Sequence, residues 1–138
     1  MATAYTGKDA AVKLNGGAIS LMGTWSLSGQ AVDLLEMTAF QDEYKQYTPG
    51  LKDGGTISFS GLYDGTDTAG QTALRNYNAN NTSVTDIRLY VNDTSYWTPS
   101  TTSPLSFCWV TSFEIGAEIS SLATASFEMK VSGKMVLV

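Results

Sequence analysis

Two stretches near the C-terminus alternate apolar and polar residues, and this alternation constrains the fold of the 138-residue chain more than any other feature. Apolar residues hold most odd positions, from Leu105 to Ile119 in the first stretch and from Ala123 to Leu137 in the second. A period of two is typical of a β-strand with one buried face. At about 3.3 Å per residue each stretch would extend roughly 50 Å, whereas a compact chain of this length has a radius of gyration of about 14 Å. We therefore expect these strands to bend round a barrel, to project from the body, or to pair with neighbouring copies.

The alternation also predicts how the two long strands pair. Because odd residues face inward in both strands, the loop between them must hold an odd number of residues. A loop at residues 119–121 satisfies this condition; a loop at residues 120–122 does so too, but sets Glu114 opposite Glu128, a mildly unfavourable pair. We favour the first register. The same parity predicts that Cys108, the only cysteine, lies on the polar face and has no redox role.

The rest of the chain predicts shorter strands and one helix. Alternating or apolar runs indicate strands at residues 10–14, 19–21, 56–63, 84–91 and 95–98, and a longer strand from Trp25 that could continue past Asp33. A helix is predicted at residues 67–78, with Thr68 and Gln71 spaced as a capping box. We therefore predict a mainly β fold, a β-sandwich or small barrel of about eight strands with one flanking α-helix, in a single domain that spans residues 1–138.

Two segments lack periodicity and are predicted to contact partners. Residues 38–55 combine aromatic and charged residues with a Pro-Gly turn, and we interpret them as an extended interaction loop. Apolar side chains on such a loop need cover, which a neighbouring subunit or the loop's own core would supply. The small, polar residues 1–8 could form an N-terminal arm that orders on assembly.

The residue types argue against catalysis and against a metal site. The chain has no histidine, which removes histidine-based acid–base catalysis, the usual triads and nearly all zinc sites. Residues 64–68 superficially suggest a calcium loop, but the further acidic positions that this loop needs are missing, so a strand-to-helix turn is the better interpretation. We predict no enzyme activity, no catalytic residues, no metal and no cofactor.

The charge balance restricts the partners. The net charge is −5 and the eight Lys and Arg residues are scattered, which argues against a wrapping contact with nucleic acid. We find no secretory signal and no apolar run of about 18 residues, so no membrane span is expected. Charged residues make up only 15 % of the chain, which is compatible with surfaces that partners cover.

The order of these features resembles the major tail tube proteins of long-tailed bacteriophages, in the superfamily that includes the type VI secretion tube. The resemblance covers nearly the whole chain and lies in the order and spacing of degenerate motifs. These motifs, followed by the two final strands, are Gly7-Lys8-Asp9-Ala10-Ala11-Val12-Lys13-Leu14, Trp25-Ser26-Leu27, Pro49-Gly50-Leu51-Lys52-Asp53, Gly61-Leu62-Tyr63-Asp64, Gln71-Thr72-Ala73-Leu74 and Ile87-Arg88-Leu89-Tyr90.

The resemblance implies a virion structural protein of the tail, assembled in the host cytoplasm. Six copies would form a ring, rings would stack, and an inner β-barrel would line a channel through which DNA passes without specific binding. The tube would surround a tape-measure protein and meet terminator and baseplate proteins at its ends. The alternatives are a capsid decoration module, a receptor- or glycan-binding module, and a cellular secretion-tube subunit.

Two sets of residues follow from this hypothesis. Aromatic and apolar residues of the loop are the candidates for contacts between subunits or rings: Phe40, Tyr44, Tyr47 and Leu51. Carboxylates on the polar face of the long strands are the candidates for the wall of the channel: Glu114, Glu118 and Glu128. An acidic wall would let DNA pass because like charge removes the attraction for phosphate.

Overall fold

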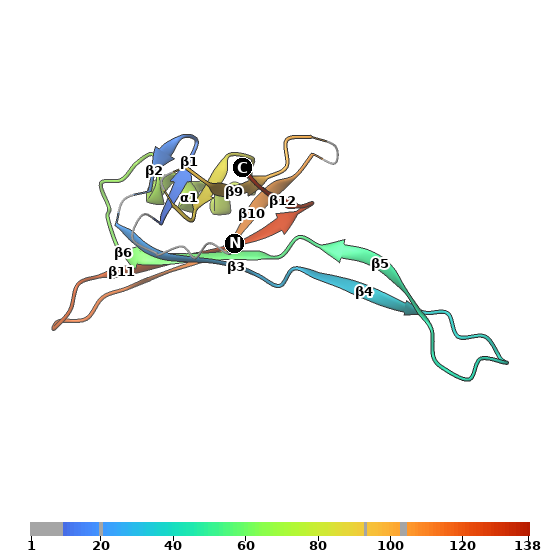
Figure 1. The fold of residues 1–138 in the computed structure, drawn as a ribbon. Helices are drawn as coiled ribbons and strands as arrows, with labels where there is room; N and C mark the ends of the chain where they lie inside the picture. The colour runs from blue at the N-terminus through green and yellow to red at the C-terminus, as the bar shows by residue number, and fades with distance from the viewer. Residues whose placement is uncertain (1–9, 20, 93, 103–104) are drawn as a thin grey trace.

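The computed structural model describes residues 10–19, 21–92, 94–102 and 105–138, so the predicted N-terminal arm at residues 1–8 lies outside the described residues. Within them the fold is mainly β, as predicted, with twelve strands and one helix (Figure 1). The elements are β1 (Ala11–Leu14), β2 (Gly17–Ala18), β3 (Met22–Ser28), β4 (Ala31–Glu36), β5 (Tyr47–Asp53), β6 (Thr56–Leu62), α1 (Gln71–Ala79), β7 (Ser83–Val84), β8 (Ile87–Tyr90), β9 (Tyr96–Pro99), β10 (Phe107–Gly116), β11 (Thr124–Ser132) and β12 (Met135–Leu137). The strands outnumber the predicted eight because the prediction missed very short strands and β5, and treated β4 as a possible continuation of β3.

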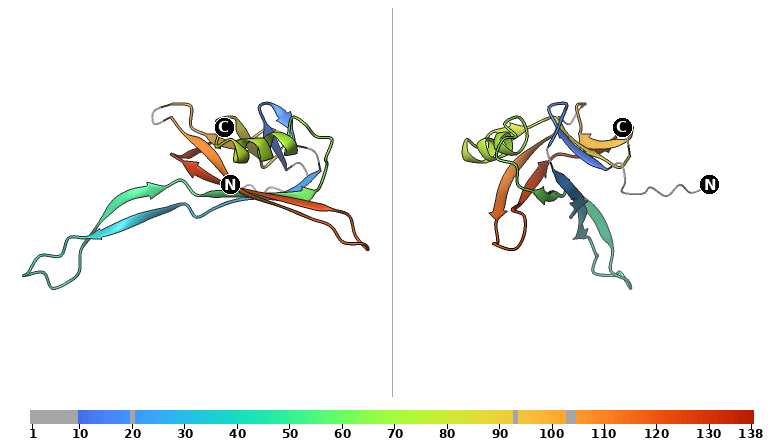
Figure 2. Two further views of the ribbon diagram at one scale, coloured as in Figure 1. Left: turned by 180° about the vertical axis from the view of Figure 1, so that it is seen from behind. Right: turned by 90° about the vertical axis from the view of Figure 1, so that its left-hand side faces the viewer.

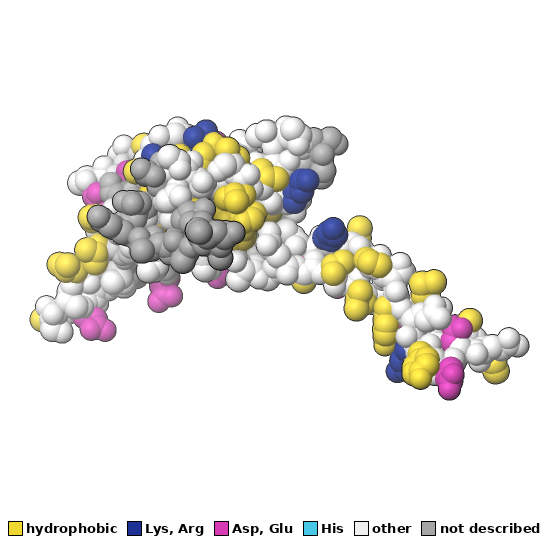
Figure 3. Space-filling model, viewed as in Figure 1, with side chains coloured by type: hydrophobic (Ala, Val, Ile, Leu, Met, Phe, Trp, Pro, Cys, Tyr) yellow, Lys and Arg dark blue, Asp and Glu magenta, His cyan; other side chains and the backbone are white. Residues whose placement is uncertain are grey.

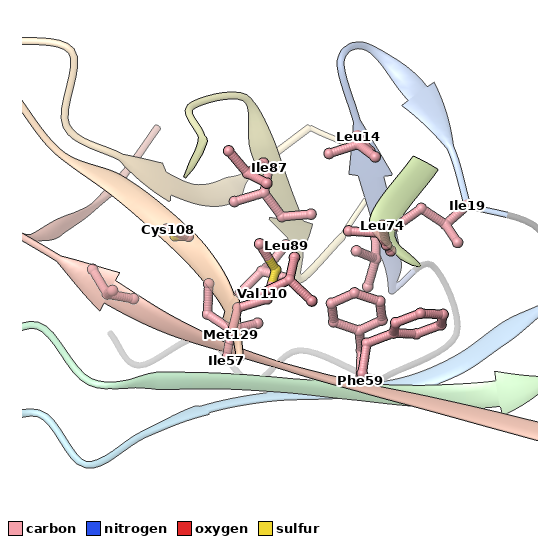
Figure 4. Close-up of a cluster of buried hydrophobic side chains, with 14 of the residues drawn as sticks. Leu14, Ile19, Ile57, Phe59, Leu74, Ile87, Leu89, Cys108, Val110 and Met129 are labelled. Carbon is pink, nitrogen blue, oxygen red and sulfur yellow. The ribbon is translucent and has the colours of Figure 1, made fainter. Parts of the chain in front are cut away.

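Two antiparallel sheets face each other and enclose the core. The long-strand sheet has the order β3-β6-β11-β10-β7, and the short-strand sheet has the order β12-β9-β8-β1-β2. Figure 4 shows Ile57, Phe59 and Met129 of the long-strand sheet pointing toward Ile87 and Leu89 of the short-strand sheet. All five side chains are almost wholly buried. One face of the long-strand sheet therefore belongs to the core, and its other face is turned away from it.

Helix α1 packs at the side of the two sheets, so the predicted flanking helix is present. Leu74 projects from it into the core. The helix begins at Gln71 rather than near residue 67, and the predicted Thr68–Gln71 capping box does not form. Instead, the carboxylate of Asp67 accepts hydrogen bonds from the backbone N–H groups of Gly70 and Gln71. This carboxylate satisfies donors of the first turn that the helix itself leaves unpaired.

The first long strand, β10, contains a β-bulge at Thr111 that the alternation does not reveal. Before the bulge the even residues Cys108 and Val110 point into the core, and Trp109 lies on the opposite face. The prediction that Cys108 lies on the polar face is therefore wrong, because the extra residue of the bulge reverses the alternation. Apolar residues occupy both parities before the bulge, so the pattern of the sequence could not decide between the two faces.

Beyond the bulge the long strands pair in the register that the sequence favours. Glu114 pairs with Ser126 and not with Glu128. The ladder ends at Gly116 and Thr124, so the connection is longer than the predicted three residues although the register is correct.

The second long stretch is two strands, because β11 and β12 belong to different sheets and are divided at Gly133. Gly133 has φ = +104°, and a Cβ atom there would lie 2.1 Å from the Oγ of Ser106, so both the backbone and the space require glycine. Val131 and Met135 are buried on either side of the division. The apolar alternation thus continues through the break, and for this reason the sequence does not show it.

Strands β4 and β5 pair only with each other and form a ribbon that projects from one end of the long-strand sheet (Figures 1 and 2). This ribbon with its connecting segment, residues 31–53, is called the arm below. The predicted loop at residues 38–55 is thus partly β-strand. Its periodicity is lost because the ribbon has a bulge between Val32 and Leu34 and is exposed on both faces, so that burial does not impose an alternation.

Candidate assembly surfaces

The outer face of the long-strand sheet is a grid of small polar residues, called the polar face below. Two rows cross the four long strands from β3 to β10. The first row is Ser26, Ser58, Glu128 and Ser112, and the second row is Thr24, Ser60, Ser126 and Glu114. These residues line a shallow hollow of about 560 Å³. The polar face thus presents hydroxyls and carboxylates to any molecule that lies against it.

The three predicted channel residues occupy different places. The structure brings Glu114 and Glu128 together on the polar face, in neighbouring rows. Glu118 lies beyond the end of the ladder, where its carbonyl accepts a hydrogen bond from the N–H of Ser121. Lys130 lies on the polar face as well, but its Nζ is 2.6 Å from a carboxylate oxygen of Asp53. The charge that remains on the polar face is therefore negative.

Both edges of the four long strands are open in the described residues. Strand β3 pairs with β6 alone. Strand β10 pairs with β7 only at Cys108 and Trp109, and the Val110 carbonyl accepts a hydrogen bond from the Asn78 side chain of α1. In the described residues this edge of β10 has no strand partner from Thr111 to Gly116. An unpaired edge presents a row of backbone N–H and C=O groups to any strand that can approach it. The long-strand sheet is thus able to accept a further strand on each side.

The arm exposes apolar side chains, two of which belong to the predicted contact residues. Leu34 pairs with Pro49 and Tyr47 lies two residues before Pro49, so these three share one face of the ribbon. Leu51 lies between Pro49 and Lys52, where the ladder changes register, so the alternation does not place it on that face. Leu51 is 88 % exposed, and Tyr47 and Leu34 are also exposed. In a soluble monomer such a face would remain in contact with water, so it is a candidate interface.

The other two predicted contact residues lie at the far end of the arm. Phe40 and Tyr44 belong to the segment that connects β4 to β5, and Phe40 is 107 % exposed. The backbone around them is held by a hydrogen bond from the N–H of Ala39 to the Asp42 carboxylate and by one from the N–H of Met37 to the carbonyl of Gln46. The segment is therefore a closed turn that presents its aromatic rings outward.

The base of the arm is fixed to the sheet by glycines and by one ion pair. Gly29 and Gly55 have φ values of +77° and +100°, where the two strands of the arm leave the sheet. The Asp53 carboxylate accepts a hydrogen bond from the N–H of Gly55 and contacts Lys130 of β11. Lys130, and next the Gly55 N–H, hold the pKa of Asp53 below its ordinary value. These contacts set the direction in which the arm leaves the body.

No candidate for catalysis or metal binding accompanies these surfaces in the part of the chain that the structure describes. No three His, Cys, Asp or Glu side chains there lie close enough to hold one metal ion. Burial raises the pKa of the Cys108 thiol to about 12, so the thiolate that a nucleophile requires is disfavoured. Helix α1 is too short to cross a membrane, and the described residues contain no longer helix.

Sequence reasoning missed a further exposed surface at the end of the β10–β11 hairpin. The alternation places Phe113, Ile115 and Ile119 inward, whereas their exposed fractions are 41 %, 40 % and 109 %. The length of the two strands could have identified these residues. Strands of about 50 Å are longer than the core of a chain of this size, so apolar side chains at the end of the hairpin have nothing to cover them.

The architecture is shared with solved tube structures. A chain in the tail of an empty gene transfer agent particle, refined with C6 symmetry, is similar to this chain with a TM-score of 0.75 and 16 % identity over 98 % of this chain and 99 % of that one. The fold is that of tail tube proteins. The chain is also similar to one in the sheath–tube complex of the extracellular contractile injection system PVC, with a TM-score of 0.69 and 13 % identity over 98 % and 91 % of the two chains.

A third tube has the same fold. The SPP1 tail tube protein is similar with a TM-score of 0.61 and 15 % identity over 97 % of this chain and 78 % of that one. No family model and no curated protein matches the sequence. The likeness to these tube structures thus lies in the fold and hardly in residue identity.

Proposed function

We propose that this chain is the major subunit of a tail tube, a virion structural protein without enzyme activity. It polymerises as stacked six-membered rings into a hollow tube that conducts phage DNA to the host. One observation carries the proposal: the long-strand sheet has an open edge on each side, a core on one face and a polar surface on the other. A sheet of this kind is complete only when copies of it are joined side by side.

Ring closure would join β3 of one copy to β10 of the next. These two strands are antiparallel within the sheet, because each neighbour in the order β3-β6-β11-β10 is antiparallel to the one before it. The joint would therefore continue the antiparallel pattern and remove both edges. Six copies would form a barrel of about 24 strands, whose radius at the backbone is roughly 25 Å for a strand spacing of 4.8 Å and a tilt of about 40°. Such a channel is wide enough for duplex DNA.

The polar face would line that channel. One face of the long-strand sheet packs against the core between the two sheets. Its other face, with the Ser, Thr and Glu residues, would therefore point into the channel. Glu114 and Glu128 would give the wall a negative charge that keeps DNA phosphates at a distance. Glu118 would lie at the rim of each ring rather than on the wall, because it follows the end of the ladder.

The arm would connect successive rings. It carries Phe40, Tyr44, Tyr47 and Leu51, which are all exposed in the isolated chain. Aromatic anchors that become buried supply most of the energy of an interface. At its ends the tube would meet terminator and baseplate proteins, and during assembly in the host cytoplasm it would surround a tape-measure protein. We propose no cofactor and no membrane span.

A tube of an injection system is the second candidate, and the similarity to a chain of the PVC sheath–tube complex favours it. The subunit would close its ring and stack in the same way. The two functions differ in what passes through the channel, so the genes beside this one would separate them.

The test is assembly of the purified protein. We expect its mass in solution to reach six times 14.8 kDa, and negative-stain electron microscopy to show rings or hollow tubes. A protein that stays monomeric over the accessible concentration range, and also in the presence of a nucleating baseplate, would contradict the proposal. Binding of this monomer to phage heads or to glycans would then point to a decoration or receptor-binding module.

A further inference from the structure

The end of the β10–β11 hairpin extends past the core, and its core-facing side is left open. Phe113 and Ile115 lie on the same side of the sheet as the buried residues Ala125 and Phe127, with which they pair. The short-strand sheet does not reach this far, and both side chains are about two-fifths exposed. Phe113 is the outer member of a row of three rings, with centroids 6.3 Å apart from Phe113 to Phe127 and 5.4 Å apart from Phe127 to Phe59.

The turn of the same hairpin carries two apolar side chains that are even more exposed. Ile119 is 109 % exposed and Leu122 is 70 % exposed. Together with Phe113 and Ile115 they form a surface that we call the hairpin patch. Soluble monomers rarely leave apolar side chains gathered in this way, and such patches mark contacts with other molecules.

The hairpin patch and the arm lie at opposite ends of the molecule. The arm leaves one end of the long-strand sheet and the β10–β11 hairpin leaves the other, both roughly along the direction of the strands (Figures 1 and 2). Hydrophobic side chains gather along the arm and appear again near the end of the hairpin (Figure 3). The open strand edges, in contrast, lie at the sides of the sheet. Lateral contacts and end-to-end contacts therefore use separate surfaces.

We propose that the arm of one copy lies on the hairpin patch of a second copy in the adjacent ring. This inference rests on the proposed tube and names the surface that receives the arm. Leu34 and Tyr47 of the arm would cover Phe113 and Ile115, while the aromatic tip would meet Ile119 and Leu122. A contact between two different patches of identical subunits repeats along an axis when the rotation between the copies does not close it into a ring, and stacking requires a contact of this kind.

The surface area of the chain agrees with a second copy as the occupant. The accessible surface is 9025 Å², whereas a compact monomer of 14.8 kDa exposes about 7,000 Å². The excess of about 2,000 Å² is of the size that a stable protein–protein interface removes from water. Neither surface resembles a site for nucleic acid, because the hairpin patch has no basic residue and the tip of the arm carries Asp42 and Glu43 beside Lys45.

The experiment combines a patch variant with a matched control. The double variant Ile119→Asp, Leu122→Asp changes exposed turn residues, so circular dichroism and thermal unfolding should match the wild type. We expect rings to form while the protein concentration needed for tubes rises at least about tenfold. The control Leu137→Asp, Val138→Asp places the same charges on two exposed apolar residues outside both surfaces, and should form tubes as the wild type does.

Cross-linking tests the contact itself. Tyr44→Cys and Ile119→Cys subunits are mixed, assembled and treated with a bismaleimide; the native Cys108 is buried and does not react. We expect dimers that contain one subunit of each kind, and few from Tyr44→Cys mixed with Thr85→Cys, which has its thiol at an exposed position between β7 and β8. Tubes of normal length from the Asp variant, or equal cross-linking in both mixtures, would overturn the inference. Failure of the wild type to assemble would instead refute the proposed tube.

Discussion

Cys108 provides a sensitive test of the architecture, because its environment depends on the bulge at Thr111. An uninterrupted alternation would place its thiol on the polar face, open to solvent. In the structure the thiol is wholly buried beneath the short-strand sheet, and burial raises its pKa from 9.0 to about 12 because a thiolate is poorly solvated there. Reaction with a thiol reagent therefore measures which residues of β10 face the core.

The expected magnitude follows from the thiolate fraction. At pH 8 a thiol of pKa 9.0 is about one-tenth ionised, whereas a thiol of pKa about 12 is ionised to about one part in ten thousand. This difference slows the reaction about a thousandfold before access is considered. Because the reagent must also wait for the sheets to open, we expect labelling to follow the rate of local unfolding.

The assay is labelling with Ellman's reagent at pH 8, followed by absorbance, first in buffer and then in denaturant. In native protein no thiol should react rapidly with the reagent, and in denatured protein one thiol should. Ser112→Cys, which adds a thiol on the polar face just after the bulge, should show one fast thiol in buffer. Rapid labelling of native wild type at the rate of this variant would refute the bulge and the placement of β10.

Four further predictions concern stability and assembly. Between pH 9 and 12 unfolded Cys108 loses its proton while folded Cys108 keeps it, so the free energy of unfolding should fall by up to about 1.4 kcal/mol per pH unit relative to Cys108→Ala, as measured by urea titration. Phe127→Ala should reduce the free energy of unfolding by about 3–5 kcal/mol, since its buried ring stacks on another; a loss below 1 kcal/mol contradicts this packing. Leu51→Asp or Tyr47→Ala should leave thermal unfolding unchanged and prevent stacking of rings; tubes of normal length from both would exclude the arm. Replacement of both Glu114 and Glu128, the two carboxylates of the polar face, by Lys should leave tubes intact in electron microscopy and slow DNA release, and normal ejection kinetics would remove these carboxylates from consideration.

The sequence predicts those parts of the fold in which one face of a strand is buried and the other is polar. Strand β6 and the distal half of β10 obey this rule, so their faces and the Glu114–Ser126 register could be predicted. The rule fails where apolar residues occupy both parities, as at Cys108 and Trp109, because a bulge is then invisible. It also fails at Gly133, where the chain moves to the other sheet without a change of parity.

The assembly surfaces could be predicted only in part. Aromatic residues without periodicity identified the arm, and β4 was predicted as a continuation of the strand from Trp25, but β5 was missed because no core imposes an alternation on the ribbon. The polar face could be predicted from the even residues of β11, but the Asp53–Lys130 pair could not, since it joins residues far apart in the sequence. The hairpin patch could not be predicted from the alternation, because the apolar residues of β10 keep a period of two where the short-strand sheet no longer covers them.

Helical reconstruction of the assembled protein by cryo-electron microscopy tests the proposed tube most directly. We expect β3 of each subunit to lie beside β10 of its neighbour, with Ser58, Ser126 and Glu128 on the wall of a central channel. A tube in which the polar face lies on the outside, or in which both edges remain unpaired, would contradict this expectation.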